Sequence, residues 1–133
     1  MQKWMIPCNV KNFDVVEHFR TNTTAFFKRN RALLLGDEVY IYVASPYSEI
    51  KYKGVIIQTG IQPSEVDKAY KVSRIEEKTF VLVEITKTFP EKTFPSSLLK
   101  ENGLGQVVNQ QPLTGKIEKF ITDIENSLEN GGE

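Results

Sequence analysis

The chain has 133 residues, of which 40% are hydrophobic and 26% are charged, and its basic and acidic side chains balance to a net charge of zero. This composition excludes the disordered and fibrous classes, and the length is that of one ordinary domain. The single cysteine excludes an internal disulfide framework and a thiolate metal cluster, and no run approaches the about 18 apolar residues of a membrane span. We therefore expect one cytoplasmic domain, residues 1–133, with no membrane partner.

A strand and a capped helix are predicted first. Residues 3–7 place Trp4 and Ile6 on one side of a short strand, and Pro7 is expected to end its regular pairing. The spacing of a capping acid, a second acid three residues later and an apolar stripe then predicts a helix, formed by Asp14, Glu17, Val15, Val16 and Phe19. Residues 21–24 are expected to end it.

A hairpin follows the Gly36-Asp37 turn. Residues 39–43 alternate Val and Ile with Tyr, which is typical of a strand whose two faces are used differently. Residues 50–57 alternate again, with Lys51 and Lys53 on the face opposite Tyr52. The loop at residues 45–48 would form the tip.

The second half predicts a long polar connection over 58–78, a strand over 79–88 and a short helix over 96–101. A closing helix is predicted by apolar residues at helical spacing, namely Ile117, Phe120, Ile121, Ile124 and Leu128. Gly131 and Gly132 are typical of a helix stop, and equally of a linker to a second domain, in which case this domain is the N-terminal module of a longer protein.

Catalytic chemistry is sparse, because the chain has one His, one Cys, no phosphate loop and no set of residues at metal-ligand spacing. We interpret His18 as a solvated helix residue rather than a general base. Cys8 is either a small buried filler or part of a pocket wall. We therefore expect no enzyme activity, no metal and no cofactor.

The sequence offers more residues suited to recognising a nucleic-acid base than residues suited to catalysis. Aromatic side chains lie near basic and amide side chains in three segments, 26–30, 46–47 and 109–111. An aromatic face stacks a base, an amide pairs with its edge and a cation holds the phosphate. Residues 1–60 carry eight basic against five acidic residues, which allows a local basic face, although an evenly solvated surface fits the same counts.

Residues 3–9, the capped helix, residues 36–43 and residues 45–52 together resemble an EVE domain of the PUA-like superfamily, to which YTH and ASCH domains are related. The resemblance covers about the first sixty residues, and the remainder agrees in layout. It implies an α+β fold, a small and strongly bent PUA-like β-barrel flanked by helices. It also implies a pocket that takes one flipped or single-stranded base, often a modified one.

Carried onto this sequence, the resemblance gives a base-binding pocket walled by Pro7, Cys8, Asn9, Phe27, Lys28, Ser45, Pro46, Tyr47 and Ile50, with Asn109, Gln110 and Gln111 closing the other side. Phe27 stands where relatives commonly place Trp, which implies a smaller base or weaker binding. The cations expected to steer the phosphates, besides Lys28, are Arg29, Arg31, Lys51 and Lys53.

The sequence therefore predicts a nucleic-acid-binding module that takes a methylated or otherwise modified base, cytosine or adenine, from DNA or RNA. DNA is favoured only because EVE domains are often tied to defence against foreign DNA, with a fused or associated nuclease as a partner. Two alternatives remain open: an ASCH-like hydrolase of modified nucleosides that uses Lys and Glu, and a protein-interaction module that docks a partner through residues 58–78 and the last helix.

Overall fold

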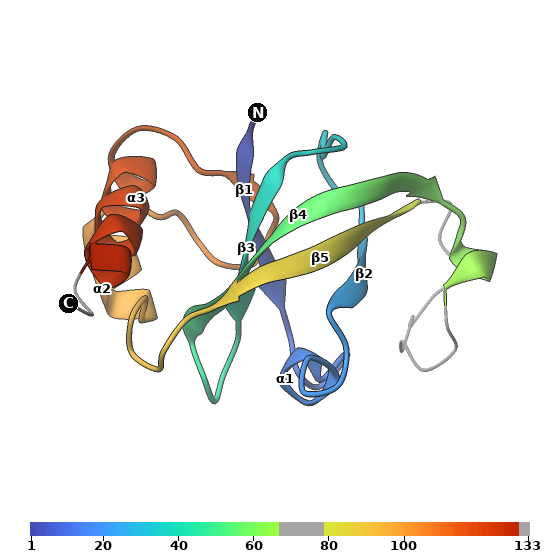
Figure 1. The fold of residues 1–133 in the computed structure, drawn as a ribbon, viewed down its shortest axis with the longest axis horizontal. Helices are drawn as coiled ribbons and strands as arrows, with labels where there is room; N and C mark the ends of the chain where they lie inside the picture. The colour runs from blue at the N-terminus through green and yellow to red at the C-terminus, as the bar shows by residue number, and fades with distance from the viewer. Residues whose placement is uncertain (67–78, 131–133) are drawn as a thin grey trace.

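The computed structural model describes residues 1–66 and 79–130. They form an α+β fold in which one six-stranded sheet is flanked by helices (Figure 1). The elements, in chain order, are β1 Lys3–Cys8, α1 Val15–His18, β2 Thr24–Lys28, β3 Glu38–Val43, β4 Glu49–Ile61, the 3-10 helix η1 Pro63–Glu65, β5 Phe80–Thr88, α2 Ser96–Glu101, β6 Gln111–Pro112 and α3 Gly115–Asn130. Among these residues no helix is both long enough and apolar enough to cross a bilayer.

The expected α+β fold with flanking helices is confirmed, but the sheet is open and does not close into the barrel that the resemblance implies. Its strand order is β2-β5-β4-β3-β1-β6, with β1 and β3 parallel and every other pair antiparallel. The edge strand β6 has two residues and pairs with β1 at Trp4 and Met5. Because β6 is so short, no backbone ladder joins it to the other edge strand, β2, within the described residues.

The two larger of three hydrophobic clusters among the described residues, the first and second cores, lie on opposite faces of the sheet, because successive side chains of a strand alternate between faces. In β3, Val39, Ile41 and Val43 face the first core, which α1 covers with Val15. Tyr40 and Tyr42 face the second core, which α2 and α3 cover at the other end of the molecule (Figure 1). The predicted use of two different faces is thus confirmed, and both faces are buried.

A β-bulge changes the alternation in β4. Tyr42 pairs with Ile50, whereas its neighbour Ile41 pairs with Tyr52, so Lys51 is an extra residue on the longer strand. Ile50 therefore faces the second core and Tyr52 the first. The expected hairpin is confirmed, but its strict alternation from residue 50 is not.

The other predicted elements divide into confirmed and missed ones. The first strand, the capped helix, the strand ending at Thr88 and both later helices are confirmed, and the amide of Glu17 donates to Asp14 Oδ1 at 3.1 Å as the capping pattern requires. The regular pairing of β1 continues through Pro7 to Cys8, so Pro7 does not end it. Residues 58–61 extend β4 rather than begin a loop, and residues 67–78 of the expected connection lie outside the described ones.

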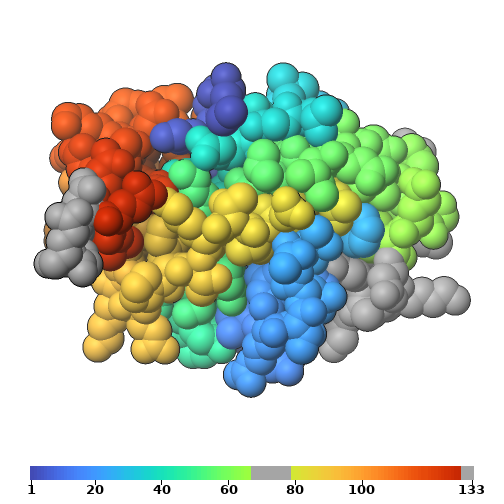
Figure 2. Space-filling model, viewed as in Figure 1, coloured from blue at the N-terminus to red at the C-terminus, as the bar shows by residue number. Residues whose placement is uncertain are grey.

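Strand β2 was not expected, because residues 24–28 were interpreted as the end of a helix and a loop. Alternate residues of β2, Ala25 and Phe27, point inward, and the strand pairs along its whole length with β5. In the space-filling view β5 remains at the surface between α3 and the segment from α1 to β2 (Figure 2). Its exposed residues are Glu84, Thr86 and Thr88.

Candidate nucleic-acid interface

A cavity of about 430 Å³ lies where the end of β1, the segment after β2 and the loop before β6 meet. We call it the carboxamide cavity, because five of its ten lining residues are Asn or Gln. The lining residues are Pro7, Cys8, Asn9, Asn12, Asn30, Ala44, Val107, Val108, Asn109 and Gln110. Among the described residues that line it, none is Lys, Arg, Asp or Glu.

Gln110 fixes two walls of this cavity. Its side chain is 3% exposed, its Nε2 donates to the carbonyl of Lys28 at 2.6 Å, and its Oε1 accepts from the amide of Asn30 at 3.1 Å. A side-chain carboxamide has the same donor and acceptor as a peptide group. Gln110 therefore links the two open edges of the sheet in place of a backbone ladder.

A second cavity, of about 350 Å³, adjoins the first. It is lined by Asn30, Arg31, Asn109 and Gln110, three of which also line the carboxamide cavity. Arg31 Nη1 donates to the carbonyl of Gln110 at 3.2 Å, and the guanidinium lies 5.7 Å from the ring centroid of Trp4. The first cavity has no charged residue in its described lining, whereas the lining of the second includes the cation Arg31.

The sequence left open whether Cys8 is a small buried core residue or part of a pocket wall, and in the structure it is both. It is 7% exposed within the first core, and it also lines the carboxamide cavity. Burial, assisted by the charge of Asp14, raises the pKa of the thiol to about 12. Its Sγ lies 3.5 Å from the carbonyl of Phe13, to which it donates. The thiol is therefore neutral at physiological pH.

Comparison with known proteins identifies the fold. No family model and no curated protein matches the chain. Solved structures do: ASCH from Zymomonas mobilis (12% identity, TM-score 0.66, 92% of this chain and 94% of that one) and a Pseudomonas putida protein (20%, 0.66, 92% and 98%). Human THYN1, in complex with DNA that contains 5-methylcytosine, is similar too (16%, 0.65, 94% and 98%). The chain has the fold of these ASCH and THYN1 structures.

Within this fold, several of the predicted site residues meet at the two cavities. Pro7, Cys8, Asn9, Asn109 and Gln110 line the first, and Arg31 lines the second. Five further lining residues were not among the predicted pocket residues, although one of them, Asn30, belongs to the 26–30 segment singled out for base recognition. They are Asn12, Asn30, Ala44, Val107 and Val108. Asn12 also had a signal, since it lies in the connection between the predicted first strand and the predicted helix, where loops carry function.

The predicted aromatic wall is absent from the described lining of the cavity. Phe27 is 7% exposed because its position in β2 points into the first core, where its ring packs edge-on to Phe13 at 6.4 Å. Tyr47 is 38% exposed and lies under the ammonium of Lys51, at 5.0 Å. Neither ring lines the cavity.

The remaining predicted pocket residues lie elsewhere. Ile50 is fully buried in the second core, and Ser45 and Pro46 are exposed in the loop after Ala44. Gln111 donates from Nε2 to the carbonyl of Gln106, which closes its own loop. Lys28 is half-buried and contributes its carbonyl to Gln110.

Three of the predicted phosphate-steering cations are engaged away from the cavity. Arg29 donates from Nε to the carbonyl of Leu33 at 3.1 Å, and Lys51 is buried against Tyr47. Lys53 lies on the face of the sheet that α3 covers, with its Nζ 3.1 Å from Glu38 and 3.0 Å from Glu125. Of the four, only Arg31 lines either cavity.

His18 is not the solvated residue that was expected. Its Nε2 lies 2.7 Å from the carbonyl of Thr24, and its ring packs edge-on to Phe13 and Phe19 at 5.1 and 5.4 Å. It is half-buried and holds α1 to β2. Across residues 1–66 and 79–130, no three His, Cys, Asp or Glu side chains are grouped as metal ligands.

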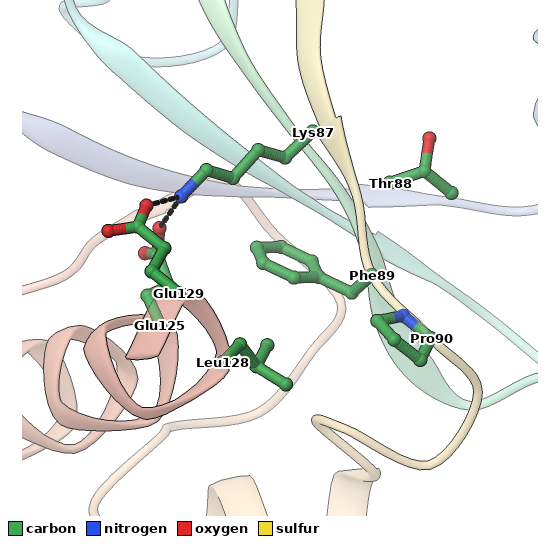
Figure 3. Close-up of a pocket in the computed structure, with 7 residues that line it drawn as sticks. All are labelled: Lys87, Thr88, Phe89, Pro90, Glu125, Leu128 and Glu129. Atoms are coloured by element: carbon green, nitrogen blue, oxygen red, sulfur yellow. Dashed lines mark hydrogen bonds and ion pairs between the residues drawn. The ribbon is translucent and has the colours of Figure 1, made fainter. Parts of the chain in front are cut away.

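A third cavity, of about 290 Å³, lies between the end of β5 and the last turns of α3 (Figure 3). Phe89 and Leu128 form its apolar side, and Lys87 reaches across to Glu125 and Glu129. The charges here are paired with one another. The carboxamide cavity, with the adjoining cavity at Arg31, is therefore a better candidate for binding a ligand than this third cavity.

Proposed function

We propose that the chain is an EVE-type module that binds nucleic acid and takes a single base into the carboxamide cavity. The observation that carries the proposal is a cavity with five carboxamides and no ionised side chain among its described lining residues. Carboxamides present a donor and an acceptor side by side, and pair with base edges as Asn and Gln do with adenine. The volume falls within the range of roughly 300–1,000 Å³ that is usual for small-ligand sites.

We infer that the preferred base is a methylated cytosine in DNA. The complex of the similar human THYN1 with DNA containing 5-methylcytosine supports this choice. The aliphatic side chains of Pro7, Val107 and Val108 offer an apolar surface for a methyl group beside the amides. The proposed function also includes a role in defence against foreign DNA, in which a fused or associated nuclease is the partner of this module.

Binding is favoured over hydrolysis of a modified nucleoside. The hydrolase that the sequence left open needs Lys and Glu at the pocket, and neither type is among the described lining residues. The Cys8 thiol is held neutral, which is the wrong state for a nucleophile. Incubation of the protein with free 5-methyldeoxycytidine should therefore leave the nucleoside intact.

The test is a fluorescence-anisotropy titration with single-stranded DNA and RNA that carry cytosine or 5-methylcytosine at one central position. We expect the wild type to bind the methylated DNA most tightly. Asn109→Ala should weaken that binding by roughly 5- to 150-fold, because a well-placed amide–base pair contributes about 1–3 kcal/mol. Asn109 is exposed, so this substitution should leave the melting temperature unchanged.

The matched control is Asn126→Ala, which removes an exposed carboxamide from α3. It should bind the methylated DNA like the wild type. Equal affinity of the wild type for both bases, or an Asn109→Ala variant that keeps the wild-type preference, would contradict the proposed cavity.

A further inference from the structure

We propose that the two adjoining cavities form one nucleotide site, with the base in the carboxamide cavity and its phosphate on Arg31. This inference rests on the proposed function and adds the ligand class, a nucleotide unit rather than a bare base or nucleoside. Asn30, Asn109 and Gln110 line both cavities, so a group in one adjoins a group in the other. A nucleotide has the matching order of parts, with a neutral heterocycle at one end and an anion at the other.

Arg31 has the geometry of an anion receptor. One guanidinium nitrogen donates to the carbonyl of Gln110, and one face of the group lies over Trp4, whereas the side chain as a whole is exposed. Among the described residues no carboxylate pairs with it, in contrast to Lys53 and Lys87. A guanidinium has five N–H donors in a planar fork that matches phosphate oxygens in pairs. Several donors of Arg31 therefore remain for a ligand.

The support beneath Arg31 is rigid. Trp4 is buried, and its Nε1 donates to Asp37 Oδ2 at 2.9 Å. The same oxygen accepts from the amide of Leu34 at 3.0 Å, and Asp37 Oδ1 accepts from the amide of Gln2 at 3.1 Å. The stacking surface for the guanidinium is thus fixed before a ligand arrives, which lowers the entropy cost of binding.

Gln110 links the two ends of the site. Its side chain bonds to the backbone of Lys28 and Asn30, beside the carboxamide cavity, while its main-chain carbonyl holds Arg31. One buried residue thereby sets the spacing between the base end and the phosphate end. A ligand with both parts gains from both ends without moving either.

The experiment compares ligands with and without a phosphate. 5-Methyl-2′-deoxycytidine and its 5′- and 3′-monophosphates are used to displace a labelled, methylated oligonucleotide from the wild type and from Arg31→Gln. We expect a monophosphate to displace the label from the wild type at a concentration at least about tenfold lower than the nucleoside, since hydrogen bonds to charged groups contribute about 1.5–3 kcal/mol. In Arg31→Gln this advantage should fall to about one.

Two further variants sharpen the result. Lys100→Gln removes the same charge from an exposed position on α2 and should keep the tenfold advantage. Arg31→Lys keeps the charge but loses the planar fork, and should keep only part of the advantage. The salt dependence of oligonucleotide binding should also become shallower by about 0.7 in log–log slope in Arg31→Gln, as expected for one lost contact to a single strand.

A phosphate advantage that is equal in the wild type and Arg31→Gln overturns the nucleotide site while leaving the base cavity in place. A wild type that binds no oligonucleotide overturns both proposals. If the site is confirmed, comparison of the monophosphate with the oligonucleotide shows whether the natural ligand is a free nucleotide or a nucleotide within a strand. A monophosphate that binds as tightly as the oligonucleotide identifies a free nucleotide, and a much tighter oligonucleotide identifies a nucleotide within a strand.

Discussion

The thiol of Cys8 lies in the wall between the first core and the carboxamide cavity, and its surroundings set its reactivity. Burial, followed by the charge of Asp14, raises its pKa from 9.0 to about 12. The thiolate is the reactive form of cysteine. This rise in the pKa lowers the fraction of Cys8 that is thiolate at pH 8 by roughly 1,000-fold. The position of Cys8 beside a ligand cavity therefore does not make it a nucleophile.

We accordingly predict that Cys8 resists alkylation in the native protein. Iodoacetamide at pH 8 should modify it at least about 100-fold more slowly than in the denatured chain, because the thiolate is both scarce and buried. Mass spectrometry of samples quenched over time measures both rates. Since Cys8 is the chain's one cysteine, the denatured sample is a complete internal control. Rapid labelling of the native protein would show that the cavity opens to the thiol more than its geometry indicates.

Some residues of the candidate site came from the resemblance to EVE domains rather than from local patterns. That resemblance assigned Pro7, Cys8 and Asn9 to the pocket, and in the structure they lie at the end of β1 or just after it and line the cavity. Phe27 was misplaced because β2 was missed, and inward alternation on that strand turns its ring into the core. The side chain of Gln110 bridges about eighty residues of sequence, and local patterns carry no signal for such a contact.

At the scale of elements, the pairing of β4 with β5 depends on a close approach at Gly54. The register of these strands shifts between Lys53 and Gly54. A Cβ added at Gly54 would lie 2.6 Å from the carbonyl oxygen of Glu84 and 2.7 Å from Val83 Cγ1. Because the nearest obstacle is backbone, the strands would have to separate to admit it.

We predict that Gly54→Ala lowers the free energy of unfolding by about 1–3 kcal/mol, the usual cost of overpacking a well-packed site. Urea denaturation followed by circular dichroism measures the loss. Gly105→Ala is the matched control, because its added Cβ would meet the flexible end of the Gln111 side chain at 3.2 Å, and it should change stability far less. Equal stability of Gly54→Ala and the wild type would mean that the β4–β5 contact is looser than described.

Elements were predictable where hydrophobic periodicity is long or a cap is explicit. The closing helix repeats its apolar residues over several turns, and Asp14 caps α1 in the expected manner. In contrast, β6 has two residues, too few for any period to show. The bulge at Lys51 was equally invisible, because it depends on the register against β3 rather than on the residues of β4 themselves.

At the scale of the whole molecule, α3 is fastened to the sheet by a buried ionic network as well as by the second core. Glu125 is buried, and accepts a hydrogen bond from the hydroxyl of Tyr40. Its other oxygen lies 3.0 Å from Lys53 Nζ and 3.4 Å from Lys87 Nζ. Lys87 also pairs with Glu129, one turn further along the helix (Figure 3). Three neighbouring strands, β3, β4 and β5, are thereby bonded to one residue of α3.

This network makes the docking of α3 dependent on pH. Burial alone would raise the pKa of Glu125, but the hydrogen bonds from Tyr40 and Lys53 and the nearby charges of Lys53 and Lys87 outweigh it and hold that pKa below its ordinary value of 4.5. A carboxyl group whose pKa is lowered by folding stabilises the native state above its unfolded pKa. That contribution is lost as the pH falls from about 4.5 through the folded value.

We predict that Glu125→Gln lowers the free energy of unfolding at pH 7 by about 2–3 kcal/mol, somewhat less than the 3–5 kcal/mol typical of a broken buried pair, because Lys53 keeps Glu38 as a partner. The difference from the wild type should shrink as the pH is lowered below 4.5, since the protonated wild type loses the same interactions. Urea denaturation at pH 7, 4.5 and 3.5 measures it. Glu129→Gln removes a largely exposed partner of Lys87 and should cost at most about 1 kcal/mol. A Glu125→Gln deficit that stays constant down to pH 3.5 would mean that the carboxylate charge does not hold α3 in place, and that packing of the second core alone does.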